Sequence, residues 1–278
     1  MLPLSFKMRH MAAEVAAKTC RALAVSLCLL LVCACPYLLR ADRSVSTDLK
    51  SQYFLNKMQN EKLPVMRRVP YIDSLERLDP SFASRHLNKK GHLYMKATRF
   101  NDALRCFEKL AKQKNLSLDE RLKALYWQAW CYNATAQYSK ALNTVLNIFA
   151  SEKPDSLWYH DAYSYLLVYR TYDLLRQHNM AERYLVKADS VLKSRSPKSK
   201  KWGDLHLTVE LYKAALYLCR GRYPEALAQC RKTQQMAVTP LDRQMADMNF
   251  AYLLEYMGEP AKAEELYNQF MQEKDVYI

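Results

Sequence analysis

Residues Leu87 to Leu110 read LNKKGHLYMKATRFNDALRCFEKL, and this stretch decides the fold. Ala103 follows Gly91 by twelve positions; Tyr94 lies three positions after Gly91, and Phe100 lies three before Ala103. Helical residues three or four positions apart share a face, so the small and aromatic residues form stripes that can face each other. Small residues let two helices approach closely, and aromatic rings fill the space beside them. The stretch therefore predicts a pair of antiparallel helices.

The same spacing recurs four more times along the chain. The further pairs are Ala129/Ala141, Tyr169/Ala181, Ala214/Ala226 and Ala251/Ala263, with Tyr169 as the one bulky member. The second members of successive pairs are separated by 38, 40, 45 and 37 residues. Gly221 and Gly258 stand shortly before Pro224 and Pro260, as expected where one helix ends and the next begins. No alternating, strand-like run accompanies them. Five pairs in series predict an all-α solenoid.

This series resembles the tetratricopeptide repeat (TPR), whose pattern runs Gly/Ala, aromatic, aromatic, Ala, aromatic, Ala. The first unit matches it at Gly91, Tyr94, Phe100, Ala103 and Phe107, and the fourth unit, RGRYPEALAQC, is the closest local match. All the intervals exceed the about 34 residues of the ideal repeat. The resemblance extends over 84–272 and implies a right-handed superhelical solenoid of about five antiparallel helix pairs.

The resemblance also implies where a partner binds, because the first helix of each pair lines the concave face in similar proteins. Carried over position by position, the groove residues are Asn88, His92, Lys96, Tyr126, Trp130, Asn133, Tyr163, Arg170, Asp173, Tyr252 and Tyr256. Tyr, Trp and Arg often anchor interfaces, although Tyr also packs between repeats, and both interpretations stay open. Asn88 and His92 replace the Lys and Asn with which chaperone-binding relatives clamp a terminal carboxylate, so that ligand is not expected.

The N-terminal segment predicts a link to a membrane. Residues Ala22–Leu39 read ALAVSLCLLLVCACPYLL and follow the basic residues Lys7, Arg9, Lys18 and Arg21. This is typical of a signal peptide or an anchor, and the basic flank places the repeats outside the cytoplasm. The segment Val32–Cys35 resembles a bacterial lipoprotein box, which makes Cys35 the lipidation candidate. An uncleaved anchor, lipidation and plain secretion are the three alternatives.

Three segments follow from these features. Residues 1–40 form the signal peptide or membrane anchor, 41–83 a linker with N-terminal capping helices, and 84–278 the repeat domain. Within the middle segment, Leu49–Met58 and Val69–Leu78 have helical spacing. One or two short helices there would cover the apolar face that a terminal repeat otherwise exposes.

The net charge of +14 is unevenly distributed. Residues 84–240 hold 27 basic and 13 acidic side chains, whereas the last 38 residues hold 3 basic and 8 acidic ones. This asymmetry could steer an acidic partner or favour head-to-tail self-association, or it could reflect the solvated faces of solenoid helices. Nucleic acid is not an expected partner, because the repeats are predicted to lie outside the cytoplasm.

The sequence carries no motif typical of catalysis. His86, His92, His160, His178 and His206 show no metal-ligand spacing, and no P-loop, GxSxG or HExxH occurs. Cys106, Cys131, Cys219 and Cys230 lie in predicted helices and are expected to be buried. We therefore expect no enzyme, cofactor or metal, but a membrane-tethered bacterial scaffold that binds a protein or peptide on the periplasmic side. The alternative is a stand-alone or truncated sensor domain of a membrane signalling regulator.

Overall fold

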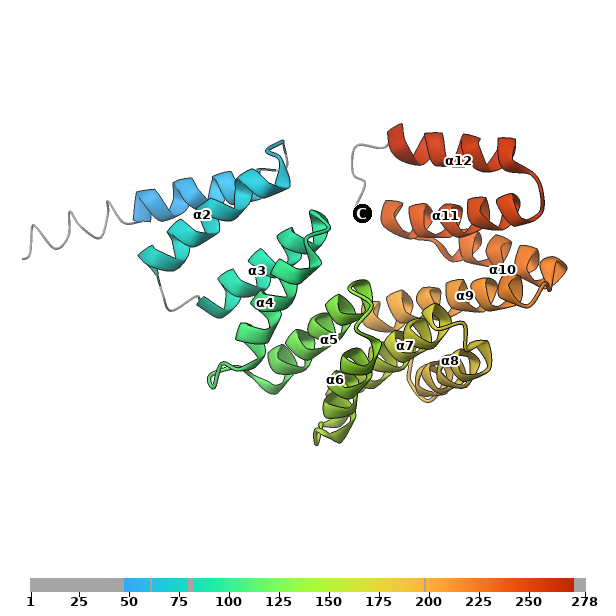
Figure 1. Ribbon diagram of the computed structural model, residues 1–278, viewed down its shortest axis with the longest axis horizontal. Coiled ribbons are helices and arrows are strands. Elements are labelled where there is room, and N and C mark those ends of the chain that lie inside the picture. Colours follow the sequence, from blue (N-terminus) through green and yellow to red (C-terminus); the bar gives the residue numbers. More distant parts are fainter. Residues whose placement is uncertain (1–47, 61, 80–82, 198, 273–278) are drawn as a thin grey trace, which may run out of the picture. The chain divides into compact units, whose positions relative to one another are not determined.

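The computed structural model describes residues 48–60, 62–79, 83–197 and 199–272. Within these ranges all regular structure is helical (Figure 1). The predicted leader, with its apolar run at 22–39 and Cys35, lies outside the described residues. Among the helices that are described, none combines the length and the hydrophobicity that a membrane span requires.

The chain divides into two compact units, Met1–Asn60 and Glu61–Ile278. In the first unit a helix covers residues 48–59. The second unit begins with α2 (Val65–Leu78), which packs against α3 (Ala83–Lys96) and is tied to it by an ion pair of 2.5 Å between Lys90 Nζ and Asp73 Oδ1. The helix at 48–59 and α2 lie where helical spacing was predicted, at Leu49–Met58 and Val69–Leu78. The division at Asn60, however, places α2 with the repeats and splits the segment 41–83.

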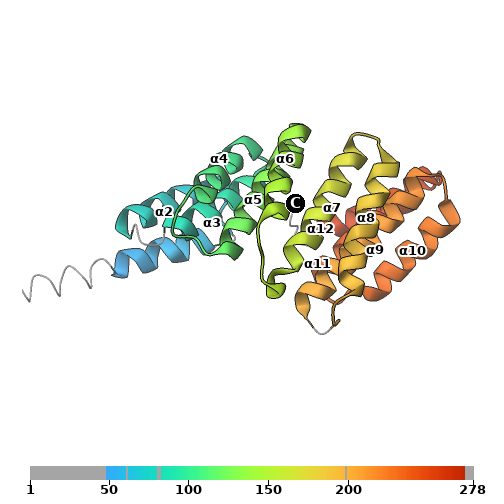
Figure 2. The same cartoon turned by 90° about the horizontal axis from the view of Figure 1, so that it is seen from below.

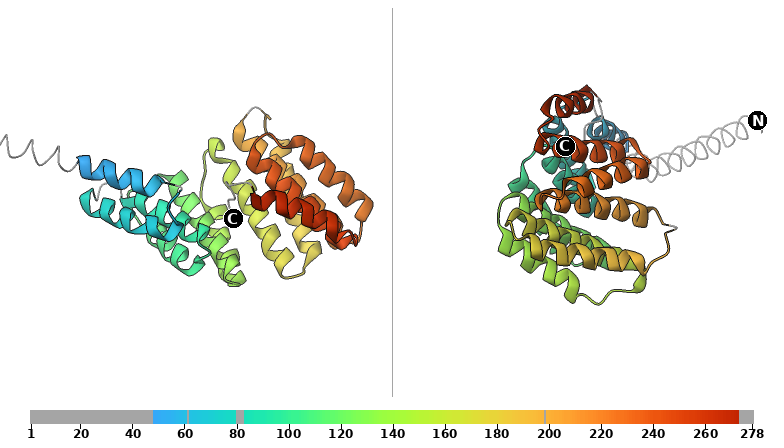
Figure 3. Two further views of the ribbon diagram at one scale, coloured as in Figure 1. Left: turned by 90° about the horizontal axis from the view of Figure 1, so that it is seen from above. Right: turned by 90° about the vertical axis from the view of Figure 1, so that its right-hand side faces the viewer.

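Five helix pairs follow one another in the second unit (Figures 1 and 2). They are α3 with α4 (Phe100–Ala111), α5 (Leu118–Ala134) with α6 (Tyr138–Ala150), α7 (Tyr159–Leu174) with α8 (His178–Lys193), α9 (Lys200–Cys219) with α10 (Tyr223–Met236), and α11 (Pro240–Tyr256) with α12 (Pro260–Gln272). A short 3-10 turn, η2 (Asp155–Leu157), precedes α7. Figure 3 shows α11 and α12 side by side. The first helices α5, α7, α9 and α11 also contact one another in series. The predicted helical solenoid is confirmed.

The paired small residues form the contacts within the pairs. Gly91 is buried, and the other nine members are each at most 3 % exposed. A Cβ atom on Gly91 would lie 2.7 Å from Cζ of Phe107, a fully buried ring on α4. Tyr169 and Ala181 belong to one buried cluster, as do the two small residues of the fourth pair and of the fifth. The twelve-residue spacing therefore marks where two helices touch.

All five turns within the pairs have the same geometry. The seventh residue after the first member of each pair has a positive φ: 55° at Thr98, 57° at Ala136, 59° at Arg176, 69° at Gly221 and 79° at Gly258. In the first turn the N–H of Thr98 donates to the carbonyl of Met95, and that of Arg99 to the carbonyl of Tyr94, both at 2.9 Å. Equivalent bonds occur in the other four turns. This is the Schellman motif, which satisfies the last carbonyls of a helix.

A buried carboxylate links the two helices of the fourth pair. Glu210 on α9 is 3 % exposed and accepts hydrogen bonds from Lys213 (2.6 Å) on the same helix and from Gln229 (2.6 Å) and Lys232 (2.5 Å) on α10. Burial opposes ionisation of Glu210, but these donors outweigh it and lower the pKa of the carboxyl to about 2. Glu210 is therefore ionised at neutral pH and is held by two cations.

Candidate functional site

A hollow of about 450 Å³ lies where the first helices α7, α9 and α11 end, and we call it the three-helix hollow. Its walls include three of the predicted groove residues, Asp173, Tyr252 and Tyr256. Asp173 comes from α7 and the two tyrosines come from α11, and the common turn geometry brings the ends of these helices together. Asp173 and Tyr252 stand 79 positions apart in sequence, and the fold places both in this one hollow.

Tyrosine side chains dominate the exposed surface of the three-helix hollow. Tyr252 and Tyr256 are 47 % and 54 % exposed, their ring centroids lie 5.0 Å apart, and their hydroxyl oxygens are separated by 3.2 Å. The hydrogen bond with Tyr256, followed by burial, raises the pKa of Tyr252 to about 12, so this phenol stays protonated at neutral pH. Leu174 and Tyr223 in the same hollow are also exposed. Aromatic side chains left in water in this way are typical of interaction surfaces.

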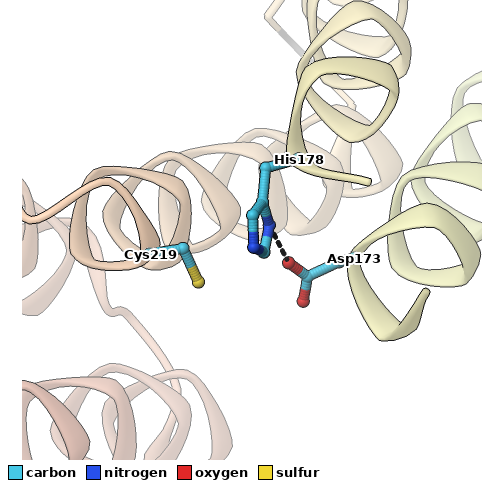
Figure 4. A group of neighbouring side chains, drawn as sticks. All are labelled: Asp173, His178 and Cys219. Carbon is cyan, nitrogen blue, oxygen red and sulfur yellow. Dashed lines mark ion pairs between the residues drawn. The ribbon is translucent and has the colours of Figure 1, made fainter. Parts of the chain in front are cut away.

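Three side chains with metal-ligating atoms meet in the same hollow: Asp173, His178 and Cys219 (Figure 4). Asp173 lies in the last turn of α7, His178 is the first residue of α8, and Cys219 is the last residue of α9. Nδ1 of His178 lies 3.2 Å from Oδ1 of Asp173, and the ligating atoms of all three residues lie within 4.8 Å of one another. Burial, followed by the charge of Asp173, raises the pKa of the Cys219 thiol.

The exposure of Cys219 differs from the prediction. Cys106, Cys131 and Cys230 are buried, as expected for cysteines in packed helices, but Cys219 is exposed. Cys219 is the last residue of α9, where the chain turns towards α10, whereas the other three lie within helices. No short motif could have revealed the cluster, because Cys219 stands 41 residues after His178.

Four other predicted groove residues gather between α5 and α7. The Arg170 guanidinium lies 5.1 Å from the centroid of the Trp130 ring, and the rings of Tyr126 and Tyr163 are 5.7 Å apart. All four side chains are half-buried, and burial raises the pKa of Tyr126. These side chains therefore pack one repeat against the next and leave only part of their surface to a partner.

The groove residues of the first pair lie apart from these. Asn88 and His92 on α3 line a small hollow of about 140 Å³ together with Glu120 and Trp127 of α5. The His92 ring stands edge-on to Trp127 at 4.8 Å, and burial, with the charges of Lys89 and Lys96, lowers its pKa to about 4. His92 is therefore neutral at physiological pH. The Lys96 side chain is exposed.

The prediction for Asn133 is wrong. Its side chain is 5 % exposed, and its Nδ2 donates to Oγ1 of Thr171 at 2.8 Å. This bond links α5 to α7 in the interior, because a buried amide needs a polar partner and Thr171 supplies it. Asn133 therefore holds two repeats together and cannot contact a ligand.

Comparisons with known proteins agree with the helical-repeat architecture. No protein-family profile and no curated protein matches the sequence. Among solved structures, the apo form of RapI matches with a TM-score of 0.53 at 12 % identity, covering 80 % of this chain and 95 % of RapI. BtubC from P. vanneervenii has a TM-score of 0.48 at 16 % identity, covering 74 % and 86 %. A tetratricopeptide repeat protein from Parabacteroides merdae ATCC 43184 has 0.45 at 18 %, covering 82 % and 81 %. The likeness to RapI shows a shared fold.

Proposed function

We propose that this chain is a non-catalytic scaffold that binds a protein or peptide partner in the three-helix hollow. The exposed pair Tyr252 and Tyr256 carries this proposal. Two large rings standing about half in water have area to bury on binding, and tyrosines lose little conformational freedom when a partner covers them.

The form of the hollow favours a polypeptide over a small molecule. Its volume of about 450 Å³ would admit a small ligand, since such pockets hold roughly 300–1,000 Å³. Small-molecule pockets, however, enclose most of the ligand, whereas the tyrosines here remain 47 % and 54 % exposed. Arg176 and Asp173 line the same hollow and offer one charge of each sign. An apolar side chain of the partner would pack against the exposed faces of the rings, and its backbone amides would meet the polar groups.

Site-specific photocrosslinking tests this function. A photoreactive phenylalanine analogue replaces Tyr252 in the full-length protein, and irradiated membranes are searched by mass spectrometry for adducts. Tyr53, which is 53 % exposed in the first unit, is the matched control position. We expect a protein adduct from position 252 and none from position 53. Adding Tyr256→Ala should lower its yield by about 30-fold, the effect of losing roughly 2 kcal/mol. Equal labelling from both positions, or a yield unchanged by Tyr256→Ala, would refute the proposal.

We further propose that the scaffold is tethered to the outer face of a bacterial cytoplasmic membrane through residues 1–40. The support is the basic segment followed by the apolar run at 22–39. Intact-mass measurement of membrane-extracted protein tests it. A mass beginning at Cys35 with added acyl chains, or a full-length mass in the membrane fraction, is expected. Recovery of the unmodified chain in the cytoplasmic fraction would contradict the tether.

A further inference from the structure

We propose that Asp173, His178 and Cys219 together bind a divalent zinc ion in the three-helix hollow. The three side chains come from α7, α8 and α9 and point toward a common region, with the imidazole between the carboxylate and the thiol (Figure 4). Each ligand is the kind of group that zinc takes: an imidazole nitrogen, a thiolate sulfur and a carboxylate oxygen.

The distances within this cluster suit a tetrahedral metal site. With metal–ligand bonds of about 2.0–2.3 Å, two donor atoms of a tetrahedron stand roughly 3.3–3.8 Å apart. The His178 Nδ1 to Asp173 Oδ1 distance of 3.2 Å is already close to that value. With either imidazole nitrogen allowed as the donor, the ligating atoms of the three residues lie within 4.8 Å of one another, and rotation about χ1 of the exposed Cys219 side chain can move its sulfur closer.

The imidazole contributes a second, independent observation. Although Nδ1 of His178 is buried and lies near the carboxylate, the contact lacks hydrogen-bond geometry, so this atom has no hydrogen-bond partner within the described part of the chain. A buried polar atom without such a partner is costly, and a metal ion placed between the donors would satisfy it.

The charge and the chemical softness of the three ligands favour a zinc ion. On binding, the Cys219 thiol releases its proton to solvent, so one thiolate and one carboxylate neutralise the two positive charges of the ion. A thiolate and an imidazole favour Zn²⁺ over Mg²⁺ or Ca²⁺, which prefer oxygen ligands. Three protein ligands leave the fourth tetrahedral position to water or to a donor from a partner. The three protein ligands all belong to this chain, so the ion can bind before a partner does.

Metal titration of the full-length, tag-free protein tests the site. The protein is stripped with a chelator, kept reduced and titrated with ZnCl₂ by calorimetry. We expect one zinc ion more per chain in the wild type than in Cys219→Ala, and His178→Gln should weaken that site more than about 10-fold. Cys230→Ala, which removes a buried thiol outside the cluster, is the matched control and should bind like the wild type. The difference between variants is decisive because Cys20, Cys28, Cys33 and Cys35 also carry thiols.

The absorption spectrum of the cobalt-substituted protein shows whether a thiolate binds the metal. CoCl₂ added to the stripped protein should give a thiolate-to-cobalt charge-transfer band and intense tetrahedral d–d bands, and both should be lost in Cys219→Ala but retained in Cys230→Ala. Equal zinc stoichiometry in the wild type and Cys219→Ala, or a cobalt spectrum without the thiolate band, would overturn the proposal. The photocrosslinking experiment uses no added metal, so either proposal can fail alone. Far-ultraviolet circular dichroism checks that all variants keep their helix content.

Discussion

Replacing Gly91 by alanine should destabilise the protein, although alanine is the better helix former. Gly91 lies inside α3, where a Cβ atom would stand 2.7, 2.9 and 3.0 Å from three ring carbons of Phe107. The ring cannot retreat freely, because it is fully buried and contacts His92 and Trp127, at centroid distances of 5.4 and 6.4 Å. Either the two helices of the first pair move apart or the ring leaves its preferred position.

A matched substitution isolates the size of this effect. Gly203 lies in α9 and has no atom within 4 Å of its ideal Cβ position, so Gly203→Ala adds a methyl group without a clash. Both substitutions gain up to about 1 kcal/mol from helix propensity. The difference between the two variants therefore reports overpacking alone, and we expect about 1–3 kcal/mol. In a unit of this size that corresponds to a Tm gap of about 2–12 °C.

Thermal and urea unfolding followed by circular dichroism measure the gap. A double-mutant cycle adds Phe107→Leu, which removes the ring atoms nearest to Gly91. If the clash is the cause, Gly91→Ala should cost about 1–3 kcal/mol less in the Phe107→Leu background. If Gly91→Ala and Gly203→Ala shift the midpoint equally, or if the cycle shows no coupling, the contact between the small residue and the ring does not control the packing of the pair.

Two further predictions concern a turn and a buried charge. Ala136→Gly should raise the free energy of unfolding by about 1 kcal/mol, because alanine is strained at a φ of 57°. Gly221→Ala, at a φ of 69°, should lower the free energy of unfolding by a similar amount. Equal urea midpoints for the two variants and the wild type would contradict this. Glu210 should make stability fall with acid. Its pKa is about 2 in the folded chain against an ordinary 4.5, so the unfolded state takes up the proton first, and about 3 kcal/mol that is fully present above pH 4.5 is lost towards pH 2. In urea unfolding across this range, Glu210→Gln should remove that slope; an unchanged slope would contradict the assignment.

The sequence was sufficient for the helix pairs but only partly for their turns. Contacts between small residues leave a periodic trace, since any larger side chain at Ala103 or Ala141 would push two helices apart. The turns leave such a trace only where glycine occupies the left-handed position, as at Gly221 and Gly258. At Ala136 and Arg176 the fold imposes the same conformation on residues that do not favour it. Local sequence therefore gives no sign of these turns, and only the repeat register does.

The binding residues were predictable by position but not by exposure. Asn133 and Asp173 both stand four residues after the first member of their pair, Ala129 and Tyr169. Asn133 is buried because Thr171 of the next first helix meets its amide, whereas Asp173 faces the three-helix hollow. Position in the repeat gives the direction in which a side chain leaves the helix. Which residues cover that side chain depends on the neighbouring repeat. For Asn133 the covering residue is Thr171, 38 positions away, and no local sequence pattern predicts a contact over that separation.

The irregular intervals between repeats leave the three-helix hollow intact. In every pair the left-handed residue follows the first member by seven positions, so the first helices end at a constant distance from their packing contact. The additional residues of the 45-residue interval lie instead before that contact: α9 has 20 residues, against 16 in α7 and 17 in α11. This difference in length thus lies at the opposite ends of the first helices, away from the turns within the pairs. The ends of α7, α9 and α11 stay in register, and side chains from three repeats can build one site.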